Sequence, residues 1–522
     1  MADLVLTTLN ARYAHASFGL RYLMANLPPD VRARASLREF VIHDRPIDVV
    51  EALLAEAPVL VGFGVYIWNV DELRRVVAML KALRPEIVVV LGGPEVSHEV
   101  EGQPIVALAD YVVCGEGEGV FGGLCEAVLR GERPGGKVIE APTPHLDAVA
   151  MPYDLYDADD IAHRTVYVEA SRGCPFRCEF CLSSLPIAVR AFPLAPFLAA
   201  MEGLIARGVR HFKFVDRTFN LDIGTSRAIL EFFLARLAPG MLLHFELVPD
   251  RLPEELRAII GRFPEGVLQF EVGIQTFDEE VGRRIQRRQK LEAVEDNLRF
   301  LAEHTGVHVH ADLIVGLPGE GVEGFGRGFD RLVGLGPQEI QVGILKRLRG
   351  TPIGRHDGTH RMRYSPDPPY ELLANDLLSF EAMQDLRRFA RFWDLVANSG
   401  NFPHTLALLP LDGSMFRGFA DLTAWVWRHE RQTHQISLKR WVGLLQRYLV
   451  EARGVEPAAA AETLLRDYMR GERNDVPPVL RPALTEEVVQ AQRQRSWPRV
   501  AAEGAGRRQQ RHRPATVEPA AE

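Results

Sequence analysis

The sequence predicts an α/β protein in which a doubly wound parallel sheet is followed by a partial (β/α)6 barrel and then by a helical carboxyl-terminal domain. Three observations support this prediction. Short apolar runs alternate with helical patterns over the first 130 residues, the alternation recurs six times between residues 166 and 345, and the pattern is helical from about residue 365. Strands that alternate with helices form parallel sheets that those helices cover on both faces.

The first domain contains five runs of apolar and β-branched residues that we expect to be strands, at 4–8, 37–42, 59–65, 87–91 and 111–114. Between them, helical patterns occur at 20–27, 49–55, 73–83 and 121–129. This order predicts a doubly wound sheet. Ligands of such sheets bind beyond the carboxyl ends of the strands, so the loops at those ends are the candidate binding site.

The second strand–helix series predicts a barrel that is open on one side. Its expected strands are 166–170, 211–215, 242–248, 268–274, 307–315 and 340–345, and its expected helices are 196–207, 226–237, 254–262, 291–304 and 324–334. Parallel barrels carry their active groups at the carboxyl ends of the strands. The long helices expected at the end of the fold, 370–388, 389–398, 419–434 and 438–452, are rich in aromatic residues, which either pack as a core against the barrel or cap a substrate cavity.

Breaks in these patterns give the expected domain boundaries. We expect the first domain at 1–135, a linker at 136–165, the barrel at 166–355, the helical domain at 365–475 and a disordered tail at 476–522. Glycine and proline interrupt regular structure at 131–136 and 141–144. The last thirty residues lack apolar periodicity and include a short basic run, which is typical of disorder and only weakly indicates nucleic-acid binding.

Composition excludes several classes of protein. A chain of 522 residues needs two or three domains, and its net charge of -8 gives no global attraction to nucleic acid or to anionic membranes. No apolar run is long enough to span a bilayer and the start lacks the pattern of a signal peptide, so we expect a cytoplasmic protein with no membrane partner. Three of the five cysteines lie in one loop, and we expect the other two, Cys114 and Cys125, to be buried small side chains.

The loop after the first barrel strand carries Cys174, Cys178 and Cys181. Three thiolates at this spacing can hold three irons of a four-iron four-sulfur cluster and leave the fourth iron open to a small ligand. A structural zinc site is the alternative, but zinc prefers four closed ligands and the loop contains no fourth cysteine or histidine. This cysteine spacing, with Phe180 directly before the last cysteine, resembles the radical S-adenosylmethionine (SAM) superfamily.

The loops after the third, fourth and fifth strands of the first domain are rich in glycine, which lets a flat ligand approach the backbone. A dinucleotide site would instead need its glycine fingerprint after the first strand, and tight turns are the plainer alternative. The runs at 92–95 (Gly-Gly-Pro-Glu) and 114–118 (Cys-Gly-Glu-Gly-Glu) resemble the cobalamin-binding domain that precedes the barrel in cobalamin-dependent radical SAM enzymes. This resemblance covers residues 1 to about 350, and the whole chain resembles a bacterial group of this family that has a helical carboxyl-terminal domain.

The resemblance implies a set of cobalamin contacts. The Asp-x-His-x-x-Gly motif, whose histidine binds cobalt from below in other cobalamin enzymes, is absent, and none of His15, His43 and His98 has its spacing. We therefore expect the lower face of cobalt to be water-bound, empty or covered by a bulky side chain of the third-strand loop. For these side chains the alternative is ordinary packing, or an N-cap in the case of Asn69. The expected cobalamin-binding residues are Tyr66, Trp68, Asn69, Gly92, Gly93, Pro94, Glu95, Gly115, Glu116, Gly117 and Glu118.

The resemblance also implies where SAM binds. Asp216 follows the second strand, where the superfamily contacts the methionine amine, although it also suits a turn. Strand alternation puts Glu271 and Gln275 on one face, and a buried glutamate needs an arginine or ligand partner. The expected SAM-binding residues are Phe180, Asp216, Glu271, Gln275, Ile314 and Gly316. Lys346 and Arg349, after the sixth strand, either meet an anionic group or are solvated.

The function that the resemblance implies is that of a radical SAM enzyme with three cofactors: a four-iron four-sulfur cluster, SAM and cobalamin. The cluster reduces SAM to a radical that removes hydrogen from an unactivated carbon, and C-methylation of a small-molecule or peptide substrate is the favoured outcome. The expected electron donor is a flavodoxin or ferredoxin, and no catalytic residue is assigned beyond the cluster cysteines. The alternatives are a radical ring formation, rearrangement or oxidation without methyl transfer, a cobalamin-binding regulator, and a transfer-RNA methylthiotransferase, whose extra amino-terminal cysteines and terminal β-barrel are not apparent.

Overall fold

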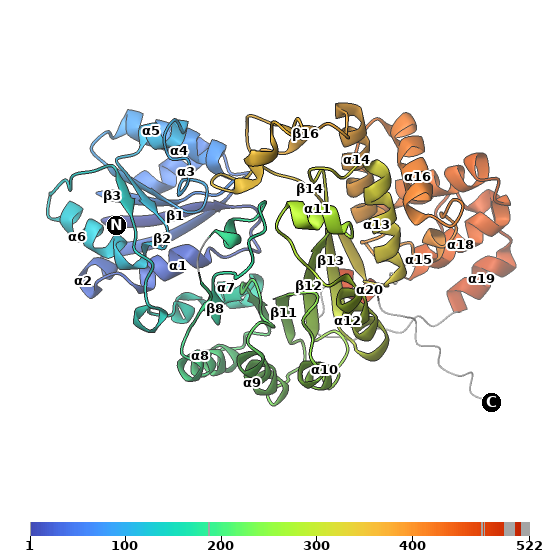
Figure 1. Cartoon of the computed structure of the whole chain (residues 1–522), viewed down its shortest axis with the longest axis horizontal. Helices are drawn as coiled ribbons and strands as arrows, with labels where there is room; N and C mark the ends of the chain where they lie inside the picture. Colours follow the sequence, from blue (N-terminus) through green and yellow to red (C-terminus); the bar gives the residue numbers. More distant parts are fainter. Residues whose placement is uncertain (1, 186–187, 471–472, 474, 495–506, 513–522) are drawn as a thin grey trace. The chain divides into compact units, whose positions relative to one another are not determined.

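The computed structural model describes residues 2–185, 188–470, 473, 475–494 and 507–512 (Figure 1). The chain forms two compact units. Unit 1 consists of Met1–Arg217, Lys346–Arg355 and Tyr364–Glu371, and unit 2 consists of Thr218–Leu345, His356–Arg363 and Leu372–Glu522. Among the described helices, none combines the length and the apolar character that crossing a membrane requires.

Unit 1 begins with a parallel sheet of six strands in the order β2-β1-β3-β4-β5-β6. The strands are β1 (Leu4–Asn10), β2 (Ala35–Val41), β3 (Leu60–Gly64), β4 (Val88–Gly92), β5 (Tyr111–Cys114) and β6 (Val138–Glu140). Each adjacent pair is parallel. The five strands expected from the sequence all form, each within a few residues of its predicted bounds.

Helices cover both faces of this sheet, as a doubly wound fold requires. Alternate residues of a strand point to opposite faces. Val5 and Val61 pack in a core with α3 (Pro46–Leu54), α4 (Val70–Leu83) and α5 (Pro104–Leu108), whereas Leu4 and Leu60 pack in a second core with α1 (Phe18–Ala25), α2 (Pro29–Arg32) and α6 (Phe121–Leu129). Figure 1 shows these two helical layers on opposite sides of the strands.

The segment expected to be a linker contains short regular elements. β6 pairs with β5 at one edge of the sheet. It escaped prediction because it has only three residues between glycine- and proline-rich runs. Further along lies α7 (Ala158–His163), whose first turn is closed by reciprocal hydrogen bonds between Asp157 and Asp160.

The six barrel strands expected from the sequence are present, and they divide between the units. In unit 1, β7 (Val166–Val168) pairs in parallel with β10 (His211–Phe214). In unit 2, the parallel order is β14-β13-β12-β11, formed by β11 (Leu242–Leu247), β12 (Leu268–Gln275), β13 (His308–Val315) and β14 (Glu339–Ile344).

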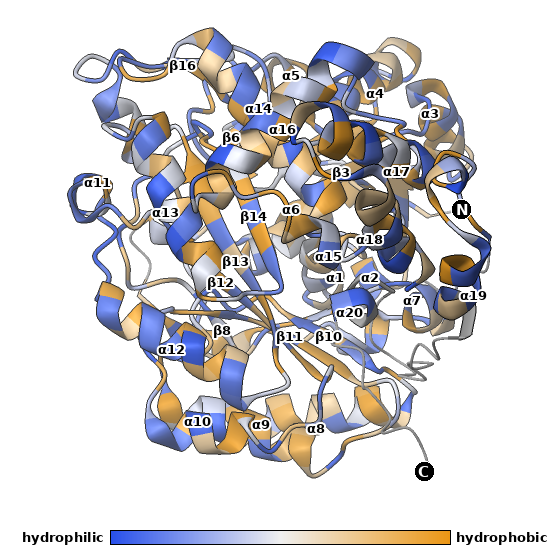
Figure 2. Cartoon of the chain, turned by 90° about the vertical axis from the view of Figure 1, so that its right-hand side faces the viewer, coloured by the Kyte–Doolittle hydropathy of each residue, from blue (hydrophilic) through white to orange (hydrophobic). Residues whose placement is uncertain are grey.

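Helices follow these strands as expected. They are α8 (Leu194–Ala206), α9 (Ile223–Leu234), α10 (Glu254–Ile260), α11 (Glu279–Arg284), α12 (Leu291–His304) and α13 (Val322–Gly334). α12 carries both hydrophilic and hydrophobic residues (Figure 2), and its buried residues are Val294, Asn297, Leu298 and Leu301. This spacing of three and four residues is the pattern that predicted the helix.

The carboxyl-terminal region is helical, but its first helix begins later than predicted. Residues 372–374 form the strand β16 (Leu372–Ala374), and the Ser379 hydroxyl caps α14 (Phe380–Val396), which continues through the expected break at residue 389. The remaining elements are α15 (Pro403–Leu406), α16 (Met415–Glu430), α17 (Leu438–Arg447), a π-helical turn (Tyr448–Ala452), α18 (Pro457–Met469), η7 (Arg481–Ala483), α19 (Glu486–Gln494) and α20 (Arg507–His512). Of the expected disordered tail, 495–506 and 513–522 lie outside the described residues.

Aromatic side chains join the helical region to the barrel helix α13 within unit 2. Phe329 of α13 is fully buried, with its ring 5.0 Å from that of Phe389 and 4.7 Å from that of Trp393, both on α14. Phe416 and Phe419 of α16 pack against Phe389. This part of the aromatic density therefore forms a core rather than a cavity cap.

Candidate functional site: a glycine-lined pocket and a cysteine loop

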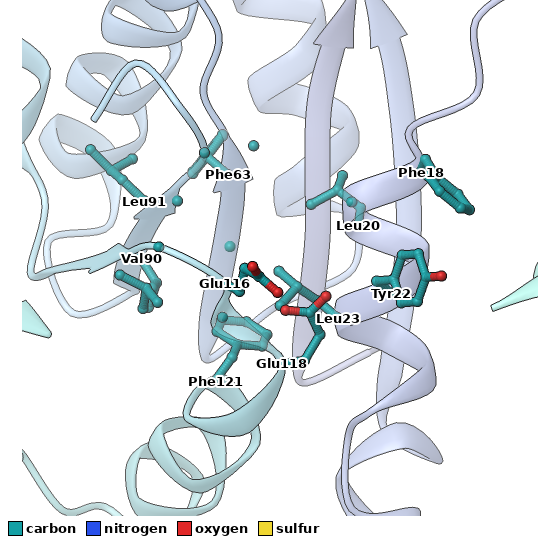
Figure 3. A pocket seen from close by; sticks show the side chains of 18 of the residues that line it. Phe18, Leu20, Tyr22, Leu23, Phe63, Val90, Leu91, Glu116, Glu118 and Phe121 are labelled. Atoms are coloured by element: carbon teal, nitrogen blue, oxygen red, sulfur yellow. The ribbon is translucent and has the colours of Figure 1, made fainter. Parts of the chain in front are cut away.

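A cavity of about 320 Å³ lies at the carboxyl ends of β3, β4 and β5 in unit 1 (Figure 3). Apolar side chains form much of its wall, with Phe18 and Leu23 on α1 and Phe121 on α6. The rest of the wall includes seven glycines, namely Gly19, Gly62, Gly64, Gly92, Gly93, Gly115 and Gly117. The pocket thus lies at the sheet edge where the sequence places a ligand site.

Glycine is required at some of these positions by geometry. Gly93 has a φ of +110°, and a Cβ atom there would lie 2.5 Å from the carbonyl oxygen of Val65. A Cβ atom on Gly62 would lie 2.9 Å from a terminal methyl of Leu6, so a side chain there would require Leu6 to shift. The exposed backbone allows a flat group to lie close to the strands, so the residues present fit the insertion of part of a cobalamin molecule.

One end of the pocket is polar because the guanidinium of Arg172 forms ion pairs with three carboxylates. Arg172 Nη1 lies 2.8 Å from Glu116 and 2.8 Å from Glu118, and Arg172 Nη2 lies 2.8 Å from Glu169. Burial opposes the charge of Arg172, but the neighbouring Glu169 and Glu118 outweigh it and raise the pKa of the guanidinium. Burial also raises the pKa of Glu169, against the effect of Arg172.

Most of the expected cobalamin residues line this pocket. Those that do so are Tyr66, Gly92, Gly93, Gly115, Glu116, Gly117 and Glu118. The Trp68 ring is stacked on the Tyr66 ring at 4.4 Å with an interplanar angle of 8°, and the tryptophan is 48% exposed. Tyr66 is therefore at the pocket, and Trp68 packs on it from the loop that follows β3.

Asn69, Pro94 and Glu95 do not line the pocket. The Asn69 side chain accepts a hydrogen bond from the Tyr66 backbone and donates to the carbonyls of Leu9 and Gly64. It makes no side-chain cap at the start of α4. Asn69 therefore fixes the backbone of the loop that carries Tyr66 and Trp68.

Glu95 is held by the segment 346–355, which we call the return segment because the chain re-enters unit 1 there. Its carboxylate, 4% exposed, accepts hydrogen bonds from Arg349 Nε at 2.8 Å and from the Tyr370 hydroxyl at 2.6 Å. Arg349 also donates to Tyr370. Arg349 is therefore held by a protein carboxylate, which is neither the substrate or cofactor anion nor the solvated surface role expected from the sequence.

The cysteine loop leaves a two-stranded antiparallel hairpin. β8 (Ser171–Arg172) pairs with β9 (Arg190–Ala191), and the three cysteines lie between these strands. Cys178 is buried, whereas Cys174 and Cys181 are half-buried. The Cys181 backbone donates to the carbonyl of Cys178 at 3.1 Å.

The cysteine loop carries the type of donor atom that an iron–sulfur cluster needs. Across the residues that the structure describes, no three Cys, His, Asp or Glu side chains converge closely enough to bind one metal ion. A four-iron cluster is bound by several cysteine thiolates, and the three thiols on one short loop fit it. The intervening Glu179 is held by the return segment, since Ile353 N donates to its carbonyl at 3.1 Å and Arg355 forms an ion pair with its carboxylate.

Two of the expected SAM residues belong to unit 1. Phe180 lies half-buried in the cysteine loop. Asp216 is buried, and its two carboxylate oxygens accept from Ala170 N at 3.0 Å and from the Ser171 hydroxyl at 2.6 Å. Burial raises the pKa of Asp216 to about 7. These contacts make Asp216 a support of the backbone that leads into the cysteine loop.

The other expected SAM residues belong to unit 2. Glu271 pairs with His244 at 3.0 Å, so a histidine is among its protein partners. Burial alternates along β12 as predicted, but the register shifts between Gly273 and Gln275, and Gln275 has a φ of +73°. Ile314, on β13, is half-buried.

Gly316, the last expected SAM residue, follows β13. It has a φ of +93°, and a Cβ atom there would lie 2.5 Å from the side chain of Leu372. Glycine is therefore needed at this position for the chain to turn against β16.

Sequence reasoning missed several residues that shape these sites. Arg172 and Arg190 flank the cysteine loop and contact the pocket glutamate Glu116. Arg172 was detectable as a charged residue between a buried strand and the cysteine motif, whereas nothing in the sequence connected Arg190 to residue 116. Glu320 was also missed: its carboxylate accepts from the Thr276 hydroxyl at 2.6 Å.

Three family models match the chain. They are described as the B12 binding domain (residues 5–124), the radical SAM superfamily (168–331) and a protein of unknown function, DUF4080 (358–505). The first two match the domains in which the pocket and the cysteine loop lie.

Individual relatives are distant. A tRNA-2-methylthio-N(6)-dimethylallyladenosine synthase of Ralstonia pickettii is 26% identical over 55% of this chain and 64% of its own length. An uncharacterized methyltransferase of Pyrococcus horikoshii is 27% identical over 58% of this chain and 70% of its own length. The chain thus spans about two thirds of the length of these relatives.

Among solved structures, the radical SAM methyltransferase TsrM from Kitasatospora setae, with tryptophan substrate and a SAM analog bound, matches with a TM-score of 0.56 at 18% identity, over 73% of this chain and 81% of TsrM. At this identity the likeness shows the fold alone. The fold, the pocket, the cysteine loop and the matching domains agree, and they identify iron–sulfur cluster, SAM and cobalamin as the cofactors. The chain therefore carries a B12 binding domain at residues 5–124 ahead of a radical SAM domain at residues 168–331.

Proposed function

We propose that this enzyme transfers a methyl group to an unactivated carbon of a small-molecule or peptide substrate, using cobalamin and SAM. The observation that supports this most is the polar end of the pocket, where Arg172 contacts the pocket glutamates and lies two residues before Cys174. A cobalamin site and a cluster site that share a residue suit a reaction that uses both cofactors on one substrate.

The chain's own residues have distinct parts in this proposal. When bound, the cluster supplies an electron to SAM, and cobalamin carries the methyl group. Cys174, Cys178 and Cys181 hold the cluster, and the glycine-lined pocket takes part of cobalamin. The apolar walls of the pocket exclude water from the bound group.

The contacts to SAM remain part of the proposal. Phe180 and Asp216 in unit 1, with Glu271, Gln275, Ile314 and Gly316 in unit 2, are the residues that we assign to SAM. Asp216 acts through residues 170 and 171, because one of its oxygens accepts from the Ala170 backbone and the other from the Ser171 hydroxyl.

The named relatives support methyl transfer, since they include an uncharacterized methyltransferase, and TsrM is a methyltransferase with tryptophan as its substrate. A small-molecule substrate follows by analogy with TsrM. A flavodoxin or ferredoxin as electron donor, a cytoplasmic location and the domain limits 1–135, 166–355 and 365–475 also remain proposals.

A methylthiotransferase is the alternative that the Ralstonia relative favours. Against it, the two cysteines of the first domain are poor ligands. Burial raises the pKa of Cys114 to about 11 and that of Cys125 to about 12, so both stay protonated thiols at neutral pH. Within the part of the chain described after residue 379, the elements are helical and no terminal β-barrel occurs.

The test is anaerobic purification with cobalamin supplied, followed by iron, sulfide and cobalt analysis and by a methyl-transfer screen with labelled SAM. We expect about four irons and one corrinoid per chain, and label that moves to a carbon of the substrate. Iron without corrinoid would sink the cobalamin assignment. If both cofactors are present and SAM is cleaved, but no label is transferred to any substrate tested, the radical rearrangement or oxidation is favoured. A corrinoid without iron would favour a cobalamin-binding regulator.

Cysteine variants test the cluster itself. Cys178→Ala removes one of three thiolates, so we expect the loss of cluster iron and of all SAM cleavage. Cys125→Ala is the matched control, because this buried thiol lies on α6 outside the loop. SAM cleavage that survives in Cys178→Ala would refute the cluster assignment.

A further inference from the structure

Two arginines stand directly opposite each other at the base of the cysteine loop. β8 and β9 pair in antiparallel register with Arg172 across from Arg190. Like charges directly opposite on paired strands repel and destabilise the pair. A carboxylate that contacts both guanidiniums offsets this repulsion.

Glu116 supplies that carboxylate, and it comes from the cobalamin-binding domain. Its Oε2 lies 2.8 Å from Arg172 Nη1, and its Oε1 forms an ion pair with Arg190. The side chains are largely buried, at 20% exposure for Glu116, 13% for Arg172 and 21% for Arg190. A carboxylate with one oxygen on each of two opposed arginines fixes the spacing of both strands.

The same glutamate belongs to the wall of the pocket. It lies between β5 and the short helix η1 (Gly117–Gly119), and Figure 3 shows its carboxylate and that of Glu118 on one side of the cavity, with Tyr22 and Phe18 of α1 across from them. A group that enters the pocket therefore meets the residue that closes the base of the cysteine loop.

Resting on the function proposed above, we infer that Glu116 is a positioning residue that couples the two cofactor sites. With the cluster bound, the cysteine loop holds Arg172 and Arg190 in place, and these hold Glu116 and the pocket wall in the arrangement that takes cobalamin. Without the cluster, the hairpin is freer and cobalamin binding must order it. Because coupling between two bound ligands is reciprocal, cobalamin also retains the cluster.

Cobalamin affinity with and without the cluster tests the coupling. Equilibrium dialysis with cobalt analysis gives the Kd for wild-type protein before and after anaerobic reconstitution of the cluster. We expect reconstitution to tighten cobalamin binding by about 5- to 100-fold, the usual range for coupled sites. In Glu116→Gln, which loses the charge between the two arginines, we expect this ratio to fall to about one to two, a change in coupling that an unspecific loss of affinity would not produce.

Glu118→Gln is the matched control. Glu118 lines the same pocket and contacts Arg172, but no contact to Arg190 is among its described interactions. If the Glu118→Gln substitution lowers the affinity for cobalamin, it therefore lowers it by the same factor with and without the cluster. The ratio of the two Kd values stays close to the wild-type ratio. Loss of coupling in Glu118→Gln together with its retention in Glu116→Gln would overturn the assignment.

The Arg190→Gln substitution removes the other partner of the Glu116–Arg190 ion pair. Arg190 is not part of the pocket wall, so the lining of the pocket keeps its residues. We expect the same loss of coupling there, so the inference can still be tested if Glu116→Gln does not fold. The reciprocal measurement is the rate at which a chelator removes iron, which cobalamin slows in wild type and Glu118→Gln but not in Glu116→Gln.

The outcomes separate the two proposals. Wild-type protein that binds no cobalamin contradicts the proposed function. Wild-type protein that binds cobalamin with equal affinity in both states overturns the coupling and leaves the function intact, and so does a coupling ratio that is unchanged in both Glu116→Gln and Arg190→Gln.

Discussion

Gly64 lies in the pocket wall in a backbone conformation that other residues adopt. A Cβ atom there would meet Thr8 and Leu20 at 3.5 Å, which is ordinary contact. Gly93 differs, because its positive φ and the nearby Val65 carbonyl exclude a side chain. A substitution at Gly64 therefore fills the pocket without forcing the strand to change.

We expect Gly64→Val to fold and to bind cobalamin about 5- to 150-fold more weakly, as overpacking by about 1–3 kcal/mol implies. Equilibrium dialysis measures the affinity. Gly119→Ala is the control, since nothing lies within 4 Å of its Cβ position and Gly119 is not part of the pocket wall. Equal affinity in Gly64→Val and wild type would show that this wall does not meet the ligand.

Glu320 gives a prediction about pH. Burial raises its pKa from 4.5 to about 7, although the Thr276 hydroxyl lowers it. The folded state therefore holds a proton that the unfolded state has lost between pH 4.5 and 7, so this group's contribution to stability falls as pH rises through that window. The full difference corresponds to about 3 kcal/mol.

We expect Glu320→Gln to raise the free energy of unfolding relative to wild type at pH 8 by up to about 3 kcal/mol and to change it little at pH 5. Urea unfolding at the two pH values measures the difference. Glu323→Gln, on the exposed first turn of α13, should give the same difference at both. A Glu320→Gln effect that is independent of pH would contradict the burial of an ionisable carboxyl.

Single residues were predictable from sequence where spacing along the chain defines the site. The cysteines, Tyr66 and the pocket glycines fall in this class. Asp216 and Glu95 were candidates from the sequence, but their partners were not predicted, because those partners come from distant segments. Arg349 and Glu95 are 254 positions apart in the sequence, and no pattern in the sequence around either residue predicts their hydrogen bond.

At the scale of elements, the return segment contacts loops from both cofactor domains. Arg349 holds Glu95, which follows β4, and Arg355 holds Glu179 inside the cysteine loop. Glu179 has a side chain only 2% exposed, whereas that of Arg355 is 53% exposed. A buried carboxylate that loses its cationic partner destabilises the folded state, because the cost of removing its charge from water is no longer offset.

For this reason, we expect Arg355→Gln to loosen the cysteine loop, so that a chelator removes cluster iron several-fold faster than from wild type. The loss of cluster absorbance after chelator addition gives the rate. Arg45→Gln serves as the control, because its ion pair with Asp48 is at the surface. Equal rates in all three proteins would mean that the return segment does not secure the loop.

Element prediction succeeded where strands and helices are long and periodic, and failed for short ones. β6 and β16 have three residues each, too few for a period-two pattern to be recognised. The start of α14 was set too early because apolar residues at 370–378 suggested a helix, whereas prolines before them and the Ser379 cap fix the real start.

The whole chain is built from two interleaved units, and cobalamin should affect them differently. The pocket belongs to unit 1 alone. A ligand that binds the folded state at one hundred times its Kd stabilises it by about 2.7 kcal/mol. We expect hydrogen exchange to slow in β3, β4 and β5 when cobalamin is added and to remain unchanged in α14 to α18.

Uniform protection across both units would contradict that expectation, and in Gly64→Val the protection at the same cobalamin concentration should be smaller than in wild type. Sequence anticipated the order of the domains but not the division of the barrel strands between the units. That division depends on chain segments that return after residue 345, and periodicity does not report which distant segments meet.

The return segment also bears on how the protein is made. Cys181 leaves the ribosome well before Arg355, and unit 2 residues occupy the chain from Thr218 to Leu345. At typical rates of synthesis the delay is on the order of ten seconds or longer. During this interval of translation, the cysteine loop therefore lacks its contacts to Ile353 and Arg355. We expect cluster insertion to follow the synthesis of residue 371.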